Sequence, residues 1–297
     1  MVEYLGCAGF SAASWGLAMC QFCVEHGEGK RWYLAAHNYA FDLDSDLKRR
    51  EYVIGFVRGF DTMRAGAITA GETLRKLPAP LARLGKTAIS KHQQKVHFGQ
   101  PVPLEDCEQV LDLATSITVI PCVCRMHERG KDAEEVCIVV TAKPIAGLLA
   151  EAFSSYDDGP GLDDFHTMTK DETMALLRSC EERGLMHSIW TFQTPFTAAI
   201  CNCNLASGCM AMKLTAGYDI KLMWRGETVA QFDTEACTGC GECARLCPFS
   251  AIDATARGPV RHLAEQCWGC GICRAGCRQN AIALVDRREV PTVANLW

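Results

Sequence analysis

The stretch Glu235-Ala-Cys-Thr-Gly-Cys-Gly-Glu-Cys-Ala-Arg-Leu-Cys-Pro-Phe-Ser-Ala-Ile252 recurs thirty positions later as Glu265-Gln-Cys-Trp-Gly-Cys-Gly-Ile-Cys-Arg-Ala-Gly-Cys-Arg-Gln-Asn-Ala-Ile282. Each copy contains the spacing Cys-x2-Cys-x2-Cys-x3-Cys, with glycines between the first three cysteines. A repeat of this length indicates a duplicated structural unit. The end of the chain is therefore expected to fold as two related halves.

Eight cysteines at this spacing predict two [4Fe–4S] clusters. Three thiolates separated by two residues can surround one face of a cubane, whereas the fourth lies on the following helix and serves the other cluster. A zinc site would place a longer gap between two pairs of thiolates. The expected ligand sets are Cys237, Cys240, Cys243 and Cys277 for one cluster, and Cys267, Cys270, Cys273 and Cys247 for the other.

On these motifs, residues 229–289 resemble the bacterial-type two-[4Fe–4S] ferredoxins. The resemblance implies a pseudo-twofold βαββαβ fold and one-electron transfer at low potential. One departure is that Arg278 follows Cys277, whereas Pro248 follows Cys247. A cation beside one cluster, and Trp268 shielding the other, would give the two clusters different potentials.

The preceding part of the chain holds eleven of the nineteen cysteines, and six of them form two groups. These are Cys122, Cys124 and Cys137, and Cys201, Cys203 and Cys209. We expect the chain to leave regular strand geometry at Pro121 and in the asparagine-flanked segment 201–204. Up to four of the six thiols could then bind a third [4Fe–4S] cluster or zinc, with Arg125 or His127 beside it. The alternative is that all six are small buried residues, as free cysteines often are.

The same two groups, with the Thr169 capping box and the turn at Gly184 between them, resemble a second family. Its members are ferredoxin-fused, cysteine-rich iron–sulfur proteins of anaerobic bacteria and archaea, and the resemblance spans about residues 100–290. It implies redox activity without identifying a substrate. Lys131 and Asn204 stand where that family tends to have further cysteines, which leaves the nuclearity of a third centre open.

Periodicity predicts an α/β-type N-terminal body. The resemblance to the two-cluster ferredoxins implies a ferredoxin-like C-terminal domain, so the chain as a whole is expected to be an α+β protein. We divide the chain into a basic, partly helical region (1–100), a cysteine-containing α/β body (101–228) and the ferredoxin domain (229–297). The expected helices cover 45–60, 103–114, 144–153 and a segment after Thr169. The expected strands cover 117–123, 136–141 and 185–192.

The N-terminal region contributes two further expectations. Residues 5–24 carry no charge but are diluted by small and polar residues, which favours a buried segment over a membrane span. Cys7, Cys20 and Cys23, with His26, are interpreted as buried groups rather than ligands. Residues 64–95 contain seven basic residues and one acid, Glu72, among regularly spaced apolar residues. They form either a solvated face or a docking surface for an acidic protein or an anionic membrane.

The chain has no secretory signal pattern, so we expect cytoplasmic, reduced thiols. The acidic net charge of −5 and the lack of interleaved aromatics argue against nucleic-acid binding. Nucleotide and hydrolase motifs are absent from the sequence. The favoured function is electron transfer with a redox partner, as a protein or a subunit of an anaerobic oxidoreductase complex. The alternatives are a redox enzyme with its own metal site at Cys122, Cys124, Cys201 and Cys203, or a redox sensor.

Overall fold

A computed structural model describes residues 31–34, 47–129, 133–156, 160–191, 197–255 and 258–296. The expectations for residues 5–24, for Cys7, Cys20, Cys23 and His26, and for Lys131 lie outside these ranges. Within the described part, helices and strands are mixed along the chain, which confirms the α+β class. None of the helices in that part has the length and apolar character needed to cross a bilayer.

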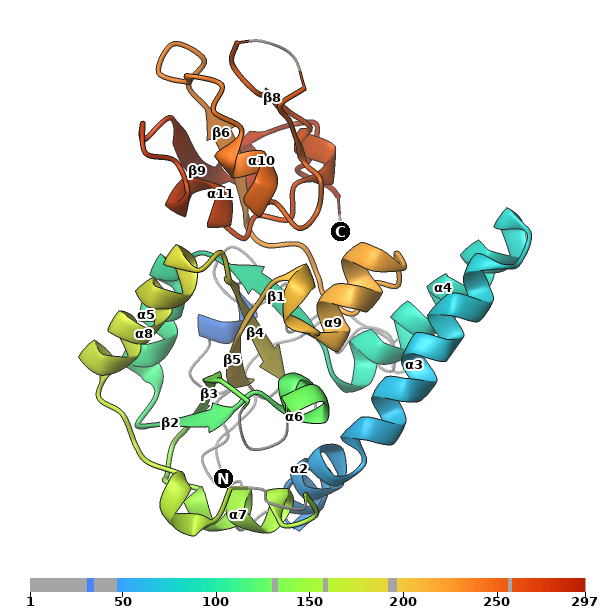
Figure 1. Cartoon of the computed structure of the whole chain (residues 1–297), viewed down its shortest axis with the longest axis vertical. Helices are drawn as coiled ribbons and strands as arrows, with labels where there is room; N and C mark the ends of the chain where they lie inside the picture. The colour runs from blue at the N-terminus through green and yellow to red at the C-terminus, as the bar shows by residue number, and fades with distance from the viewer. Residues whose placement is uncertain are drawn as a thin grey trace, which may run out of the picture.

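The body is built on a five-stranded sheet with the order β1-β4-β5-β3-β2 (Figure 1). Its strands are β1 (Gly99–Val102), β2 (Ser116–Pro121), β3 (Glu135–Thr141), β4 (Met186–Thr191) and β5 (Thr197–Cys203). Every pair of neighbours runs antiparallel. The α/β interpretation of the body was therefore wrong. Periodicity identifies a strand but not its direction, and direction decides whether a sheet is parallel.

Helices cover both faces of this sheet. On one face lie η3 (Trp32–Leu34), α5 (Leu104–Leu113) and α8 (Lys170–Glu182), which pack on Ile138 and Val140 of β3. On the other face lie α2 (Leu47–Arg58), α6 (Val123–Arg129) and α7 (Ala146–Phe153), which pack on Cys137 and Val139. Successive residues of β3 thus project from opposite faces of the sheet, as the two-residue period of a strand requires. The cysteines of β3 and β5 therefore belong to the second face.

Most of the expected elements are present with small shifts at their ends. The capping box forms as predicted, because Thr169 Oγ1 accepts from the Glu172 backbone N–H and the Glu172 carboxylate accepts from the Thr169 N–H. Strand β2 stops at Pro121, earlier than expected, because α6 begins directly after Cys122. The helix expected over 45–60 is α2, which ends at Arg58, and α3 follows from Phe60.

The basic segment forms a helical hairpin. Helix α3 (Phe60–Arg75) and helix α4 (Ala79–Val96) pack along each other and extend away from the body, as Figure 1 shows. Pro78 and Pro80 lie at the turn, where proline is tolerated because the first turn of a helix needs no backbone donors. The hairpin is anchored near its tip by Arg75, which stacks 4.5 Å from the Tyr218 ring and donates to the Gly217 carbonyl.

The C-terminal unit follows the order β6, α10, β7, β8, α11, β9. Its bounds are β6 (Thr228–Phe232), α10 (Glu242–Leu246), β7 (Ile252–Asp253), β8 (Arg261–His262), α11 (Ile272–Ala275) and β9 (Ile282–Asp286). Strand β6 pairs antiparallel with β9, and β7 with β8. The unit sits at one end of the body, above the end of the sheet at which β1 is seen in Figure 1.

Candidate iron–sulfur and thiol sites

The two cysteine loops of the C-terminal unit need glycine at equivalent positions. Gly239 and Gly269 both have φ near +70°, a conformation that other residues adopt at a cost. A Cβ on Gly239 would clash with the Gly258 carbonyl oxygen, and one on Gly269 with that of Thr228. The loops can therefore close over their cysteines only because neither residue has a side chain.

Each loop lines one of two cavities of similar size. The first, called the outer cavity, is lined by Cys237, Cys240, Cys243 and Cys277. The second, called the inner cavity, is lined by Cys267, Cys270, Cys273 and Cys247. The fourth cysteine of each repeat thus lies in the other repeat's cavity. Four soft thiol ligands around each space fit the requirements of a [4Fe–4S] cluster.

The fourth cysteines are held in equivalent ways. The backbone N–H of Ala251 donates to Cys247 Sγ over 3.4 Å, and the N–H of Ala281 donates to Cys277 Sγ over the same distance. Hydrogen bonds of this kind are among the means by which a protein adjusts the potential of a cluster. The two halves of the repeat therefore hold their exchanged cysteines with the same local geometry.

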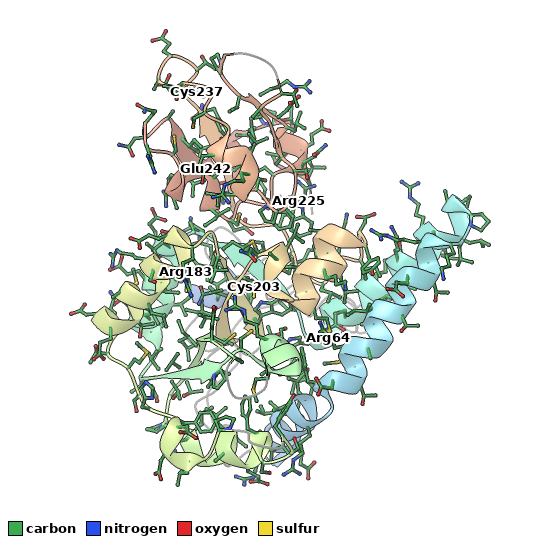
Figure 2. All side chains as sticks on the ribbon, viewed as in Figure 1. Arg64, Arg183, Cys203, Arg225, Cys237 and Glu242 are labelled. Atoms are coloured by element: carbon green, nitrogen blue, oxygen red, sulfur yellow. The ribbon has the colours of Figure 1, made fainter. Side chains whose placement is uncertain are left out.

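The two cavities differ in their access to solvent. In the outer cavity Cys240 is exposed, whereas Cys270 and Cys273 of the inner cavity are buried, and burial raises the pKa of Cys273 to about 12. Trp268 also lines the inner cavity, is buried as expected from the sequence, and stacks on Phe249 with ring centroids 4.9 Å apart. In Figure 2 Cys237 marks the end of the unit that is far from the body. The inner cavity is therefore the shielded one.

A cation that the sequence analysis did not identify, Arg225, lies beside the inner cavity. Arg225 donates to the Cys267 carbonyl over 2.9 Å and lies 5.5 Å from the Trp268 ring. Burial lowers the pKa of Arg225, although the nearby Cys267 raises it. Arg278, the residue from which the sequence predicted an asymmetry, is exposed on the outer side. The sequence did not reveal Arg225, because it lies ten positions before the start of the repeat at Glu235.

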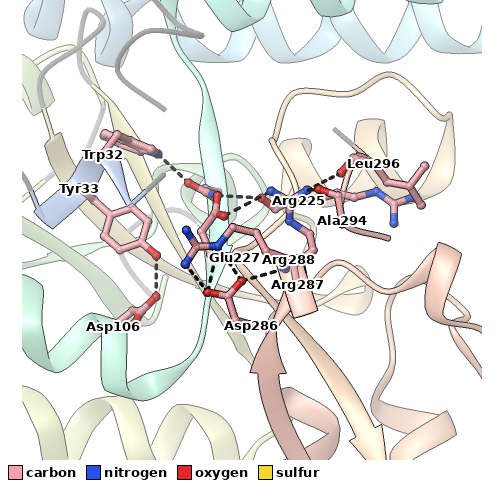
Figure 3. A network of polar contacts seen from close by, with 11 residues as sticks. Trp32, Tyr33, Asp106, Arg225, Glu227, Asp286, Arg287, Arg288, Ala294 and Leu296 are labelled. Atoms are coloured by element: carbon pink, nitrogen blue, oxygen red, sulfur yellow. Dashed lines mark hydrogen bonds and ion pairs between the residues drawn. The ribbon is translucent and has the colours of Figure 1, made fainter. Parts of the chain in front are cut away.

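The C-terminal unit is tied to the body by buried polar contacts (Figure 3). Trp32 Nε1 donates to Gln100 Oε1 over 2.7 Å, and Gln100 Nε2 donates to Glu227 Oε1 over 3.0 Å. Glu227 in turn pairs with Arg287. On the surface, Arg274 of α11 forms an ion pair with Glu105 of α5 at 2.6 Å. These contacts fix the inner cavity relative to the body sheet.

The six cysteines of the body that the sequence singled out come together on one face of the sheet. Cys137 is on β3, Cys201 and Cys203 are on β5, and Cys122 and Cys124 lie at the start of α6. Cys209 precedes the short helix α9 (Met210–Met212). Figure 2 places Cys203 in the interior of the body. We refer to these six residues as the six-thiol group.

The expectation of a broken strand was wrong for one pair. Cys201 and Cys203 are inside regular strand β5, and residues two apart in a strand project from the same face. Both thiols therefore reach the group without a loop. Asn202, between them, projects from the other face, where its Oδ1 accepts from His187 Nδ1 over 2.5 Å and its Nδ2 donates to the Val136 carbonyl. The other pair does lie at a break, because β2 ends at Pro121.

Direct contacts connect all six thiols. Cys122 is in hydrogen-bonding contact with Cys124, Cys137 and Cys203. Cys209 contacts Cys124 and Cys203, so that Cys122, Cys124, Cys209 and Cys203 form a closed ring. Cys137 continues from this ring to Cys201, with 4.0 Å between the two sulfur atoms. All of these cysteines are free, not disulfide-bonded.

Within the ring, donors and acceptors alternate. Hydrogen bonds from neighbouring thiols lower the pKa of Cys122 and Cys209, whereas donation to them raises the pKa of Cys124 and Cys203, which burial also raises. A hydrogen bond donated to a thiolate favours its charged form.

Arg125 supplies a buried positive charge beside these thiols. Its side chain is 4% exposed, forms an ion pair with Glu134, and donates through Nη2 to the Asn202 carbonyl over 3.2 Å. Burial lowers the pKa of Arg125, but the charges of Cys122, Cys203 and Glu134 raise it further than burial lowers it. The sequence analysis predicted that Arg125 or His127 would lie beside these thiols. Arg125 does, and the His127 side chain is not among those described.

Within the described ranges, no three or more His, Cys, Asp or Glu side chains are arranged as ligands of a single metal ion. The eight C-terminal cysteines share this property, because the ligands of a four-iron cluster stand around the cluster and do not meet at one point.

Comparison with known proteins identifies one segment of the chain. A search of curated proteins found no matching sequence. Residues 230–253, which contain Cys237, Cys240, Cys243 and Cys247, match the family described as the 4Fe-4S binding domain. The segment is therefore a 4Fe-4S binding domain, and through it the chain carries at least one 4Fe-4S cluster with a role in iron–sulfur electron transfer.

Proposed function

We propose that this protein relays single electrons at low potential through two [4Fe–4S] clusters, one in the outer and one in the inner cavity. The observation that carries the proposal is the exchange of the fourth cysteines, Cys247 and Cys277, between the cavities. An unpaired binding segment would leave one cavity with three ligands. Here each has four, and the two repeats depend on each other for completion.

The difference in exposure supports an order for the relay. The outer cavity reaches solvent at Cys240, so a redox partner protein can approach it. The inner cavity is shielded by Trp268 and stands against the body. Electrons would pass between the partner and the outer cluster, and then between the outer and inner clusters, with one cluster oxidised by one electron as the other is reduced by one.

We further propose that the chain acts as a subunit of an anaerobic, cytoplasmic oxidoreductase complex. The support is the size of the body, because a simple carrier needs only the C-terminal unit. The buried contacts through Gln100 and Glu227 hold that unit on the body in one orientation. Reduced thiols in the body are compatible with a cytoplasmic location.

The hairpin α3–α4 supports a peripheral contact with an anionic membrane. Leu77, Leu81 and Leu84 at its tip are 41%, 56% and 69% exposed. Lys76 and Arg83 are exposed beside them, and residues 73–104 contain no acidic residue. Exposed apolar groups flanked by cations are typical of segments that lie in the interface of anionic bilayers.

Iron and acid-labile sulfide analysis, with paired variants, tests the relay. Cys240→Ser should remove the outer cluster and Cys270→Ser the inner one, each lowering the iron content by about four per chain. Reduction by an external donor should be slowed by loss of the outer cluster more than by loss of the inner one. Equal effects of the two variants on that rate would refute the proposed order, and loss of no iron in either would refute the two-cluster assignment.

A further inference from the structure

Two members of the six-thiol group, Cys137 and Cys201, face each other across neighbouring strands. Strands β3 and β5 pair antiparallel in a register that places Ile138 opposite Ile200, so the next pair in this register is Cys137 with Cys201. The Cys137 thiol donates to Cys201, and the two sulfur atoms are 4.0 Å apart. The two side chains therefore project from the same face of the sheet and toward each other.

This placement suits a covalent bond between the two sulfur atoms. Residues directly opposite each other in an antiparallel pair have Cα atoms about 4.5–5.5 Å apart. Disulfides join cysteines whose Cα atoms are about 4.4–6.8 Å apart. Rotation about the two Cα–Cβ bonds can therefore bring the sulfur atoms to bonding distance while the sheet keeps its register. The other cross-strand neighbours of the pair are Ile120 on β2 and Ser188 on β4, which have no thiol.

The two cysteines differ in their access to solvent. Cys201 is partly exposed, whereas the exposed fraction of Cys137 is 6%. A small reagent therefore meets Cys201 first, and Cys137 is held behind it as a second thiol. Cys107 shows the ordinary case, because it is fully buried on the other face of the sheet without a thiol partner among the described contacts. A single buried cysteine of that kind behaves as a small apolar residue.

A buried cation lies close to the pair. Arg125 is 4% exposed and donates through Nη2 to the carbonyl of Asn202, the residue that follows Cys201. Its guanidinium is also within electrostatic range of Cys137. Its ion-pair partner Glu134 is 41% exposed, so solvent screens that carboxylate more than the guanidinium. A cation beside a cysteine favours the thiolate, which is the form that attacks disulfides.

We propose that Cys137 and Cys201 are a redox-active pair that undergoes thiol–disulfide exchange with low-molecular-weight disulfides. The Cys201 thiolate attacks one sulfur of the small disulfide, whose S–S bond breaks, and the leaving thiolate takes up the proton that Cys201 released. Cys137 then attacks Sγ of Cys201, and the second small thiolate leaves and takes up the proton of Cys137.

The pair thereby loses two electrons and becomes a disulfide, while the small disulfide is reduced to two thiols. An excess of the small thiol drives the same steps in reverse. This two-electron chemistry of the body is distinct from the one-electron chemistry of the C-terminal unit. It does not rest on the proposed relay.

The test is peptide mapping of the full chain after anaerobic incubation with oxidised glutathione. Trypsin leaves Cys137 as the single cysteine of residues 132–170 and places Cys201 in residues 184–213. We expect these peptides to be joined through Cys137 and Cys201, and to separate again in excess reduced glutathione. Cys137→Ser should instead retain about one glutathione per chain on Cys201. Cys107→Ser, the matched control, should form the same disulfide as the parent protein.

Each result decides the proposal. An absent or irreversible Cys137–Cys201 disulfide in the parent protein would overturn it without depending on the folding of any variant. A disulfide from Cys137 to Cys122, which it also contacts, would overturn the choice of partner.

Iron content, measured in parallel, separates a redox pair from metal ligands. Cys137→Ser and Cys201→Ser should keep the iron content of the parent protein. Loss of iron in either variant, with the circular dichroism of the parent retained, would identify the pair as ligands and refute the proposal. Failure of the C-terminal relay gives a different pattern, because Cys240→Ser and Cys270→Ser would then leave the iron count unchanged while the Cys137–Cys201 disulfide still forms.

Discussion

Arg287 and Glu227 form an ion pair in which Nη2 and Oε2 are 3.3 Å apart and both side chains are buried. Arg287 follows β9, Glu227 precedes β6, and Arg287 also donates to the carbonyls of Ala294 and Leu296. Because Gln100 of the body donates to the same carboxylate, this pair links both ends of the C-terminal unit to the body sheet (Figure 3).

Glu227→Gln should therefore destabilise the protein by about 3 kcal/mol, since removing one partner of a buried pair leaves the other charge uncompensated. The measurement is equilibrium denaturation followed by circular dichroism under anaerobic conditions. Asp286→Asn is the control, because its pair with Arg288 is much more exposed, with side chains 27% and 55% exposed, and should contribute less than about 1 kcal/mol. An equal loss of unfolding free energy in the two variants would show that the buried Arg287–Glu227 pair stabilises the protein no more than the Arg288–Asp286 pair does.

The exchange of the fourth cysteines makes a second prediction. Cys247→Ser should damage the cluster of Cys267, Cys270 and Cys273, although Cys247 is close in sequence to the other set. Cys277→Ser should do the reverse. Electron paramagnetic resonance of the reduced variants distinguishes the two clusters through their exposure to a paramagnetic relaxation agent, which reaches the outer one more readily. Damage to the outer cluster in Cys247→Ser would contradict the exchanged ligation.

The grouping of the C-terminal cysteines around two cavities was predictable because the repeat alone determines the local geometry. Four thiols at fixed spacing, with glycines such as Gly239 where φ must be positive, leave few ways to fold. The six members of the six-thiol group were also recognisable from their spacing. Their contacts were not, because Cys122 and Cys203 meet only through the order of β2, β3 and β5, which periodicity does not determine.

Other features of the site carry no signal in the sequence. Asn202 has a visible position between two cysteines, but its partner His187 is revealed only by the pairing of β4 with β5. Gln100 and Glu227 likewise look like ordinary polar residues until the C-terminal unit is placed on the body. These residues meet their partners only through contacts between segments far apart in the chain, and a single sequence does not reveal such contacts.

The hairpin gives a third prediction. Lys76→Glu combined with Arg83→Glu should weaken binding to vesicles containing phosphatidylserine roughly tenfold or more, since each cation near such a surface contributes about 1 kcal/mol. Arg75 is left unchanged because it holds the hairpin to Tyr218. Binding is measured by cosedimentation at low and high salt, with neutral phosphatidylcholine vesicles as the control. Equal binding of parent and variant, or equal binding to neutral vesicles, would remove the membrane assignment and leave a solvated surface.

His97 connects the hairpin to the body sheet and makes folding sensitive to acid. It is buried at the end of α4, with its ring centroid 4.8 Å from that of Phe56 and 5.2 Å from that of Trp190. Burial lowers its pKa to about 4, although a backbone hydrogen bond involving Thr191 raises it. The folded protein thus keeps His97 neutral in a pH range where the unfolded chain binds a proton.

The sign of the resulting pH dependence follows from linkage. Above the unfolded pKa of about 6.5, His97 is neutral in both states and has no effect on stability. As the pH falls from 6.5 towards 4, the unfolded state gains a proton that the folded state does not, so stability should decrease by up to about 3 kcal/mol. His97→Phe, which preserves an aromatic ring between Phe56 and Trp190, should remove this component. The measurement is the denaturation midpoint of parent and variant at pH 7.5, 6.0 and 5.0, where the difference between them should change in favour of the variant as the pH falls. A constant difference across these values would show that His97 titrates alike in both states.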